Sequence, residues 1–132
     1  RVDSLWSVFR GEDGPPLFGQ KQVIFVFSTK CRIFSSNLDA WHRIASEARK
    51  CKTGVYAVSL DSIQSTIKYV QENRIISYRV FVPRSARSFS GDNRISGIPL
   101  TVLRGSQGHI ENIWLGAIGT EEVKEICREI SQ

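Results

Sequence analysis

The 132-residue sequence has no methionine and contains three cysteines, four prolines and two histidines. Three cysteines are too few for a fold built from disulfides, and no two of them have the close spacing of a zinc knuckle. The histidines, His42 and His109, are far apart in the sequence. We therefore expect no metal site and no other cofactor.

The sequence also lacks a long apolar run. The longest candidate, Val23–Phe27, is far shorter than the roughly 18 residues that a membrane span requires. The chain starts at Arg1 without Met and without a basic-then-apolar leader, so its compartment cannot be inferred from this start. A signal peptide or membrane anchor would have to precede Arg1.

The composition predicts a folded chain of one domain, residues 1–132. Its hydrophobic residues make up 41% and its charged residues 23%, which excludes a disordered tail and a low-complexity linker. Its length suits one hydrophobic core. Residues 1–20 contain the turn-forming run Gly11–Pro16 and are expected to be a lead-in segment.

The excess of positive charge is concentrated in one stretch. The chain carries a formal net charge of +5, and six arginines lie between residues 73 and 110, opposed only by Asp92: Arg74, Arg79, Arg84, Arg87, Arg94 and Arg104. Such a patch either attracts acidic partners or consists of solvated arginines. It lacks interleaved aromatics and any helix-turn-helix or zinc-finger pattern, so we expect no nucleic-acid partner.

The first half of the chain alternates strands and helices. The apolar run Val23–Phe27 predicts a central strand buried on both faces. An amphipathic helix is expected from a cap at Ser35, Ser36 or Asn37 to about Lys50, then a second buried strand, Gly54–Leu60, and a helix capped by Asp61 or Ser62. This order predicts parallel strands with right-handed crossovers.

The second half has a different pattern. A short strand is expected at Tyr78–Val82, followed by a polar, irregular stretch. Leu100–Leu103 and Ile110–Leu115 flank Gly105-Ser106-Gln107-Gly108, which predicts an antiparallel hairpin. A last helix is expected from a cap at Thr120 to Ile130.

This order of elements, together with several short segments, resembles the thioredoxin-like superfamily. Phe25–Cys31 is similar to the strand and turn before the first active-site cysteine of extracytoplasmic TlpA- and ResA-type thiol-disulfide oxidoreductases. Leu17–Lys21 looks like their lead-in, and Gly97-Ile98-Pro99-Leu100-Thr101 resembles their cis-proline segment. The resemblance implies an α/β fold with a mixed central sheet and helices on both faces.

The resemblance also implies a site, with one change. Cys31 matches the first catalytic cysteine, but the family's second cysteine is Phe34 in Cys31-Arg32-Ile33-Phe34, a degenerate CxxC motif. Lys30 replaces the family's tryptophan, and Pro99, with Ile98 before it, would be cis and face the cysteine. An ordinary X-Pro bond would instead be trans. The cations Lys30 and Arg32 and a helix N-terminus would lower the pKa of the Cys31 thiol; alternatively, Cys31 is an unreactive relic.

Three functions follow as hypotheses. The first is an atypical thiol-disulfide exchange protein with the single active-site cysteine Cys31, acting on thiols or disulfides of an extracytoplasmic protein; the chain is an enzyme only if Cys31 is reactive. The second is a redox-inactive binding module that uses the cis-proline groove and the basic rim. The third is a peroxiredoxin, which Thr29 suggests, although the spacing of that family's motif is absent. The resemblance implies a periplasmic or membrane-tethered location, with any anchor outside this chain.

The other two cysteines are expected far from Cys31. Cys51 follows the first long helix, and Cys127 lies near the end of the last one. The topology places these helices on one face of the sheet, both running away from the active-site edge. Cys51 and Cys127 are therefore candidates for a structural disulfide, or else two buried thiols that act as small apolar side chains.

Overall fold

The structure is a computed structural model, and it describes residues 19–30, 36–75, 77–83, 85–87, 90, 95 and 97–132. Most of the predicted lead-in segment, residues 1–18, lies outside the described residues, as do Cys31, Arg32 and Phe34. Within the described residues, no helix is long and apolar enough to cross a membrane.

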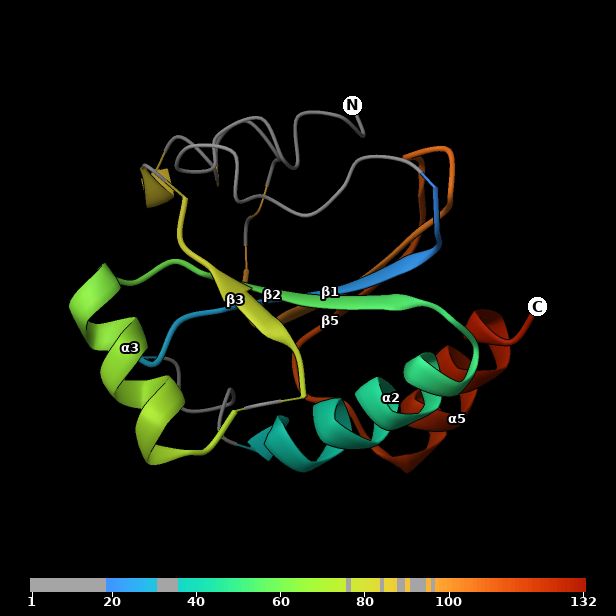
Figure 1. Ribbon diagram of the computed structural model, residues 1–132, viewed down its shortest axis with the longest axis horizontal. Helices are drawn as coiled ribbons and strands as arrows, with labels where there is room; N and C mark the ends of the chain where they lie inside the picture. Colours follow the sequence, from blue (N-terminus) through green and yellow to red (C-terminus); the bar gives the residue numbers. More distant parts are fainter. Residues whose placement is uncertain are drawn as a thin grey trace.

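The described strands form one mixed sheet of five strands in the order β3-β2-β1-β4-β5 (Figure 1). Their bounds are β1 Gln22–Phe27, β2 Gly54–Ser59, β3 Arg79–Phe81, β4 Leu100–Arg104 and β5 Ile110–Leu115. β1 pairs parallel with β2 and antiparallel with β4, and β4 pairs antiparallel with β5. The predicted central strand, the parallel β1–β2 pair and the antiparallel hairpin are therefore confirmed.

Every residue of β1 is buried, because both faces of this strand pack against apolar side chains. Val23, Phe25 and Phe27 belong to the larger hydrophobic cluster, which includes the helices. Ile24 and Val26 belong to a smaller cluster on the opposite face. A strand with two buried faces needs apolar residues at successive positions, which explains the uninterrupted run seen in the sequence.

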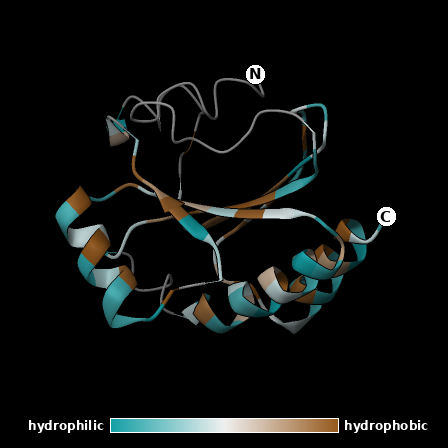
Figure 2. Ribbon diagram, viewed as in Figure 1, coloured by the Kyte–Doolittle hydropathy of each residue, from teal (hydrophilic) through white to brown (hydrophobic). Residues whose placement is uncertain are grey.

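Three described helices lie on one face of the sheet (Figure 1): α2 Leu38–Lys50, α3 Ile63–Glu72 and α5 Thr120–Ile130. Each is amphipathic, and Figure 2 shows apolar and polar residues alternating around them. The sequence predicts helices on both faces of the sheet, and the three described helices test this prediction on one face. Much of the chain between residues 84 and 96 lies outside the described residues, so the other face is not tested.

One helix start differs from the sequence prediction, and at another the predicted cap residue bonds elsewhere. Thr120 is the first residue of α5 and not its cap; the cap position is Gly119, whose backbone N–H donates to Glu122 Oε1 (2.8 Å). Asn37 occupies the cap position of α2, but its side chain makes no capping bond. The Asn37 amide instead donates to the Gly116 carbonyl (3.0 Å) and accepts from the Ile118 N–H (2.9 Å), which fastens α2 to the loop before α5.

Candidate functional site

The candidate site begins where the central strand ends. β1 stops at Phe27, and Ser28, Thr29 and Lys30 form the turn that leads to Cys31. In this turn the Lys30 backbone N–H donates to Ser28 Oγ (3.2 Å). Thr29 and Lys30 are thus two predicted site residues that the structure describes.

The carboxylate of Asp61 holds this turn in place. It follows β2, which is parallel to β1, so the two strands end at the same edge of the sheet. Asp61 Oδ1 accepts from Ser28 Oγ (2.7 Å), and Oδ2 accepts from the Thr29 backbone N–H (2.7 Å) and from Thr29 Oγ1 (2.8 Å). Three donors on one carboxylate fix the backbone immediately before Lys30.

These bonds keep Asp61 ionised. Burial raises the pKa of its carboxyl, but the hydrogen bonds from Ser28 and Thr29, together with the nearby Lys30 ammonium, outweigh it. The pKa of Asp61 is therefore below its ordinary value. A fixed negative charge on the loop after β2 therefore lies against the turn before Cys31 at neutral pH.

A second set of hydroxyl groups supports Asp61 from behind. Its backbone N–H donates to Ser59 Oγ (3.1 Å), and Ser59 Oγ shares a hydrogen bond with Thr66 Oγ1 (2.7 Å) in α3. Ser62, and not Asp61, caps α3, since its Oγ accepts from the Ser65 N–H (3.1 Å). The alternative caps left open by the sequence are thus resolved, and Asp61 is free to bind the neighbouring turn.

The Ile98–Pro99 segment lies beside the same end of β1. The peptide bond between these residues is cis. Because Val26 pairs with Leu100 in the antiparallel register, Pro99 lies next to Phe27. Pro99 is buried, its carbonyl accepts from the Gly116 N–H (2.8 Å), and Ile98 is half-buried against the smaller cluster. The prediction that Pro99 faces Cys31 is not tested, because Cys31 lies outside the described residues.

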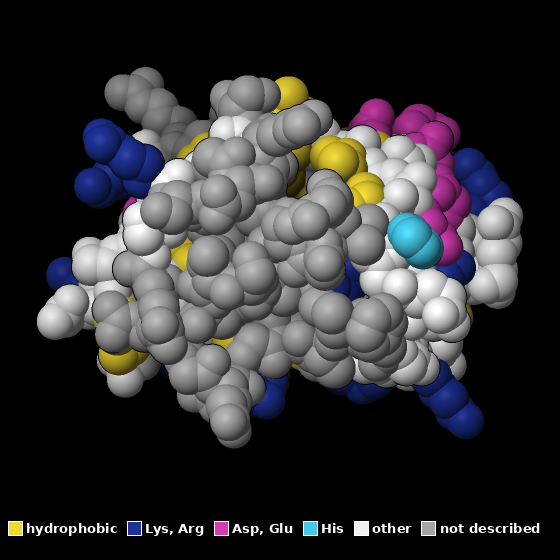
Figure 3. All heavy atoms as spheres, turned by 90° about the horizontal axis from the view of Figure 1, so that it is seen from above, with side chains coloured by type: hydrophobic (Ala, Val, Ile, Leu, Met, Phe, Trp, Pro, Cys, Tyr) yellow, Lys and Arg dark blue, Asp and Glu magenta, His cyan; other side chains and the backbone are white. Residues whose placement is uncertain are grey.

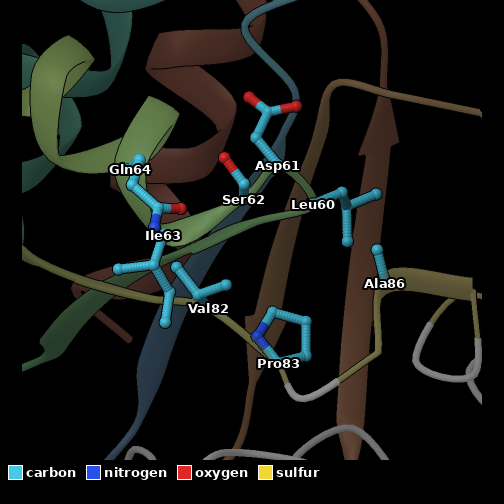
Figure 4. Close-up of a pocket in the computed structure, with 8 residues that line it drawn as sticks. All are labelled: Leu60, Asp61, Ser62, Ile63, Gln64, Val82, Pro83 and Ala86. Carbon is cyan, nitrogen blue, oxygen red and sulfur yellow. The ribbon is translucent and has the colours of Figure 1, made fainter.

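A pocket of about 490 Å³ opens beside the Asp61 loop (Figure 4). Its walls come from the loop after β2, the start of α3 and the segment after β3: Leu60, Asp61, Ser62, Ile63, Gln64, Val82, Pro83 and Ala86. Most of these side chains are apolar, and the oxygen atoms of Asp61 and Ser62 lie on one side of the group (Figure 4). The pocket and the turn before Cys31 therefore share Asp61.

The other two cysteines lie at the opposite end of the sheet. Cys51 is the residue after α2, Cys127 is in the last turn of α5, and both are half-buried free thiols. The Gly54 N–H donates to the Lys21 carbonyl (2.9 Å), so the segment after Cys51 meets the start of β1 and not its end. The predicted separation of Cys51 from the turn before Cys31 agrees with this arrangement.

The arginines of the predicted basic stretch do not all lie on the surface. Arg79 and Arg87 are exposed, but Arg104 is fully buried and hydrogen-bonded to Gln22, so it cannot belong to a basic rim. The sequence does not reveal this, because an arginine at the end of a hairpin strand is usually exposed. Figure 3 shows basic side chains spread around the face opposite the helices and acidic ones gathered at one corner.

The polar network around Asp61 was only partly visible in the sequence. Asp61 was a candidate helix cap, and Ser28 and Ser59 had no predicted role. One sequence feature could have indicated the network. Small polar residues follow two neighbouring parallel strands, and the carboxyl ends of such strands meet at one edge of the sheet. Among the described residues, no three His, Cys, Asp or Glu side chains gather where they could hold a metal ion.

No protein-family model matches the sequence, and no curated protein matches it. Solved structures do match. StoA from Bacillus subtilis is 18% identical, with a TM-score of 0.70 and coverage of 90% of this chain and 93% of that one. The exposed lipoprotein thioredoxin of Streptococcus pneumoniae is 16% identical, with a TM-score of 0.73 and coverage of 92% and 97%.

A third similar structure is a secreted disulfide oxidoreductase of Mycobacterium tuberculosis that is homologous to DsbE of E. coli. It is 10% identical, with a TM-score of 0.70, and the match covers 96% of this chain and 98% of that one. All three matches agree with the thioredoxin-like fold that the sequence predicts. The chain has the thioredoxin-like fold, with a five-stranded mixed sheet.

Proposed function

We propose that this chain is a thiol-disulfide exchange protein whose single active-site nucleophile is Cys31. The observation that carries the proposal is the Asp61 carboxylate, which fixes the Ser28–Thr29 turn where β1 ends and the chain leads to Cys31. A nucleophile needs such a rigid support, because small displacements of a reacting atom are costly in rate. The thioredoxin-like fold supports the same assignment.

The proposed reaction is one half of the usual two-cysteine cycle. The Cys31 thiolate attacks one sulfur of a partner protein's disulfide; a new Cys31–partner disulfide forms, the partner's own S–S bond breaks, and the second sulfur leaves as a thiolate that takes up a proton. Position 34 holds Phe, so no thiol there completes the second exchange. Release of the partner then requires a separate thiol.

The partners that fit this chemistry are protein thiols or disulfides outside the cytoplasm, where disulfides persist. The secreted and lipoprotein descriptions of two similar structures support this location for the present chain as well. A periplasmic or membrane-tethered protein, with any anchor outside this chain, is the form that we propose.

The reactivity of Cys31 is measured by its rate of alkylation. We expect iodoacetamide to modify Cys31 near neutral pH faster than an unperturbed thiol with a pKa of about 8.5. Peptide mapping separates this reaction from those of Cys51 and Cys127. An inert Cys31 would contradict the proposal and favour the binding module, which the exposed cations Arg79 and Arg87 support.

The role of position 34 is measured by turnover. We expect poor insulin reduction by the natural chain and at least a tenfold increase in Phe34→Cys, since that variant regains a resolving thiol. Phe34→Ala is the matched control, because it removes the aromatic ring without adding sulfur. If the natural chain turns over like a dithiol enzyme, or if Phe34→Ala is equally activated, the single-cysteine account is wrong.

A further inference from the structure

Helices α2 and α5 pack against each other, and each carries a cysteine at or near its end. These helices lie side by side, and both end on the same side of the molecule (Figure 1). Residues of both helices are fully or almost fully buried in the same hydrophobic cluster, including Ile44 and Ala48 of α2 and Ile126 and Ile130 of α5. The helix ends are therefore held in a fixed relation by core packing.

One cysteine lies at the end of each helix. Cys51 directly follows α2, and its N–H donates to the Ala48 carbonyl (3.0 Å). The Cys127 carbonyl accepts from the Ser131 N–H (3.2 Å) at the end of α5. Both side chains pack against the same hydrophobic cluster, and both thiols are free.

Cys127 lies on the helix α5 that packs against α2, and groups of α2 affect its ionisation. Burial raises the pKa of the Cys127 thiol, the Glu47 carboxylate raises it further, and Arg43 opposes this effect. Cys51 also raises the pKa of Cys127, and both side chains pack against the same hydrophobic cluster. Glu47 and Arg43 both belong to α2, and the cluster that Cys127 packs against contains buried residues of both α2 and α5.

We propose that Cys51 and Cys127 are a second redox site, which a small-molecule disulfide such as glutathione disulfide converts into a bond that joins the end of α2 to the last turn of α5. This site is independent of the proposed function of Cys31. The bond would close a loop of about 77 residues, and long loops gain most from such a constraint.

The reaction balances with one molecule of glutathione disulfide. The Cys51 thiolate attacks it, forms a mixed disulfide and releases one glutathione. Cys127 then loses its proton and attacks the Cys51 sulfur, which forms the Cys51–Cys127 bond and releases the second glutathione. The two thiols of the protein are oxidised, and the glutathione disulfide is reduced to two thiols. Cys127 is assigned the second step because its environment disfavours a free thiolate.

The described residues place Cys51 far from the turn that leads to Cys31. Gly54 pairs with Gln22 at one end of β1, whereas Ser59 pairs with Phe27 at the other. Six strand residues separate these ends by about 17 Å. A disulfide needs Cα atoms within about 7 Å of each other. Lys30 lies beyond the Phe27 end of β1, whereas Cys51 precedes Gly54 at the Gln22 end, so Cys51 and Lys30 are farther apart than a disulfide allows.

The experiment uses the full chain with Cys31→Ser, which removes the third thiol. After incubation with glutathione disulfide, non-reducing peptide mapping should show a Cys51–Cys127 crosslink and a loss of both alkylatable thiols. The melting temperature should rise by about 10 °C on oxidation and return on reduction. In the matched variants that also carry Cys51→Ser or Cys127→Ser, oxidation should give no such rise.

Two outcomes overturn the proposal. One is a folded, oxidised protein in which Cys51 and Cys127 both remain alkylatable or carry separate glutathiones. The other is a crosslink that leaves the melting temperature unchanged, since a bond that fits the packed ends of α2 and α5 should stabilise the folded chain. If a serine variant fails to fold, peptide mapping of the Cys31→Ser protein still decides between pairing and two free thiols. Loss of the Cys31 activities described above would leave these results unaffected.

Discussion

The two ends of the central strand β1 are stabilised by different forces. At its carboxyl end, one carboxylate accepts three hydrogen bonds from Ser28 and Thr29. Beyond its amino end, Cys51 and Cys127 lie where α2 and α5 pack against the hydrophobic cluster. Hydrogen bonds specify the position of each bonded atom, whereas apolar packing excludes water over a wide area without directing single atoms.

This difference suits the chemistry proposed at each end. A nucleophile must be presented to a partner, so its supporting turn is fixed by polar bonds at an edge of the sheet. A pair of thiols that react with each other needs only to be held together, and packing of two helices achieves this. The same residue type, cysteine, is therefore expected to behave differently at the two ends.

The largest expected effect comes from weakening the packed end. Ile126 is fully buried in α5, next to Cys127 in the sequence, and Ile126→Ala should lower the free energy of unfolding by about 3 kcal/mol because it leaves a cavity. Urea denaturation measures this change. Ile67→Ala is the matched control, since Ile67 is 51% exposed and should change stability by less than about 0.5 kcal/mol. Equal losses in both variants would contradict the assignment of the core.

The next effect comes from removing the charge at the polar end. In Asp61→Asn, an amide N–H₂ would face a donor where a carboxylate oxygen now accepts, so we expect a loss of about 2 kcal/mol in the free energy of unfolding. Asp39→Asn, at an exposed aspartate in the first turn of α2, is the control and should cost much less. A loss in Asp61→Asn no larger than in this control would show that the bonds to the turn are not stabilising.

The same substitution should change the pH dependence of stability. The pKa of Asp61 in the folded chain lies below its ordinary value, so the unfolded chain takes up a proton first as the pH falls. Asp61 therefore adds stability above its unfolded pKa of about 3.9, and this contribution is lost as the pH falls through the folded pKa. Urea titrations between about pH 5 and pH 3 should show a smaller decline for Asp61→Asn than for the natural chain.

The smallest effect separates the cap of α3 from the neighbouring carboxylate. Ser62→Ala removes the acceptor for the Ser65 N–H, so we expect a loss of about 1 kcal/mol with no change in pH dependence. Ser46→Ala, at an exposed position within α2, controls for the substitution itself. A pH-dependent loss in Ser62→Ala would mean that Ser62 and Asp61 act as one unit.

Much of the fold follows from local patterns in the sequence. The apolar run of β1 identified a strand buried on both faces, and the spacing of three and four identified α2 and α5 nearly to their observed ends. Helix starts were less predictable. Asn37 looks like a cap, but its amide binds the backbone of Gly116 and Ile118, a contact between segments about 80 residues apart in the sequence.

Local sequence patterns were enough to predict the order of strands and helices, because each element depends on neighbours only a few positions away. The sequence also shows that position 34, three residues after Cys31, is Phe, and hence that a CxxC dithiol is absent. The folded structure was needed to show that Asp61 binds the turn before Lys30, that Arg104 is buried and that Cys51 and Cys127 pack against one hydrophobic cluster. Each of these facts depends on which distant segments the sheet and helices bring together, and no local pattern encodes that.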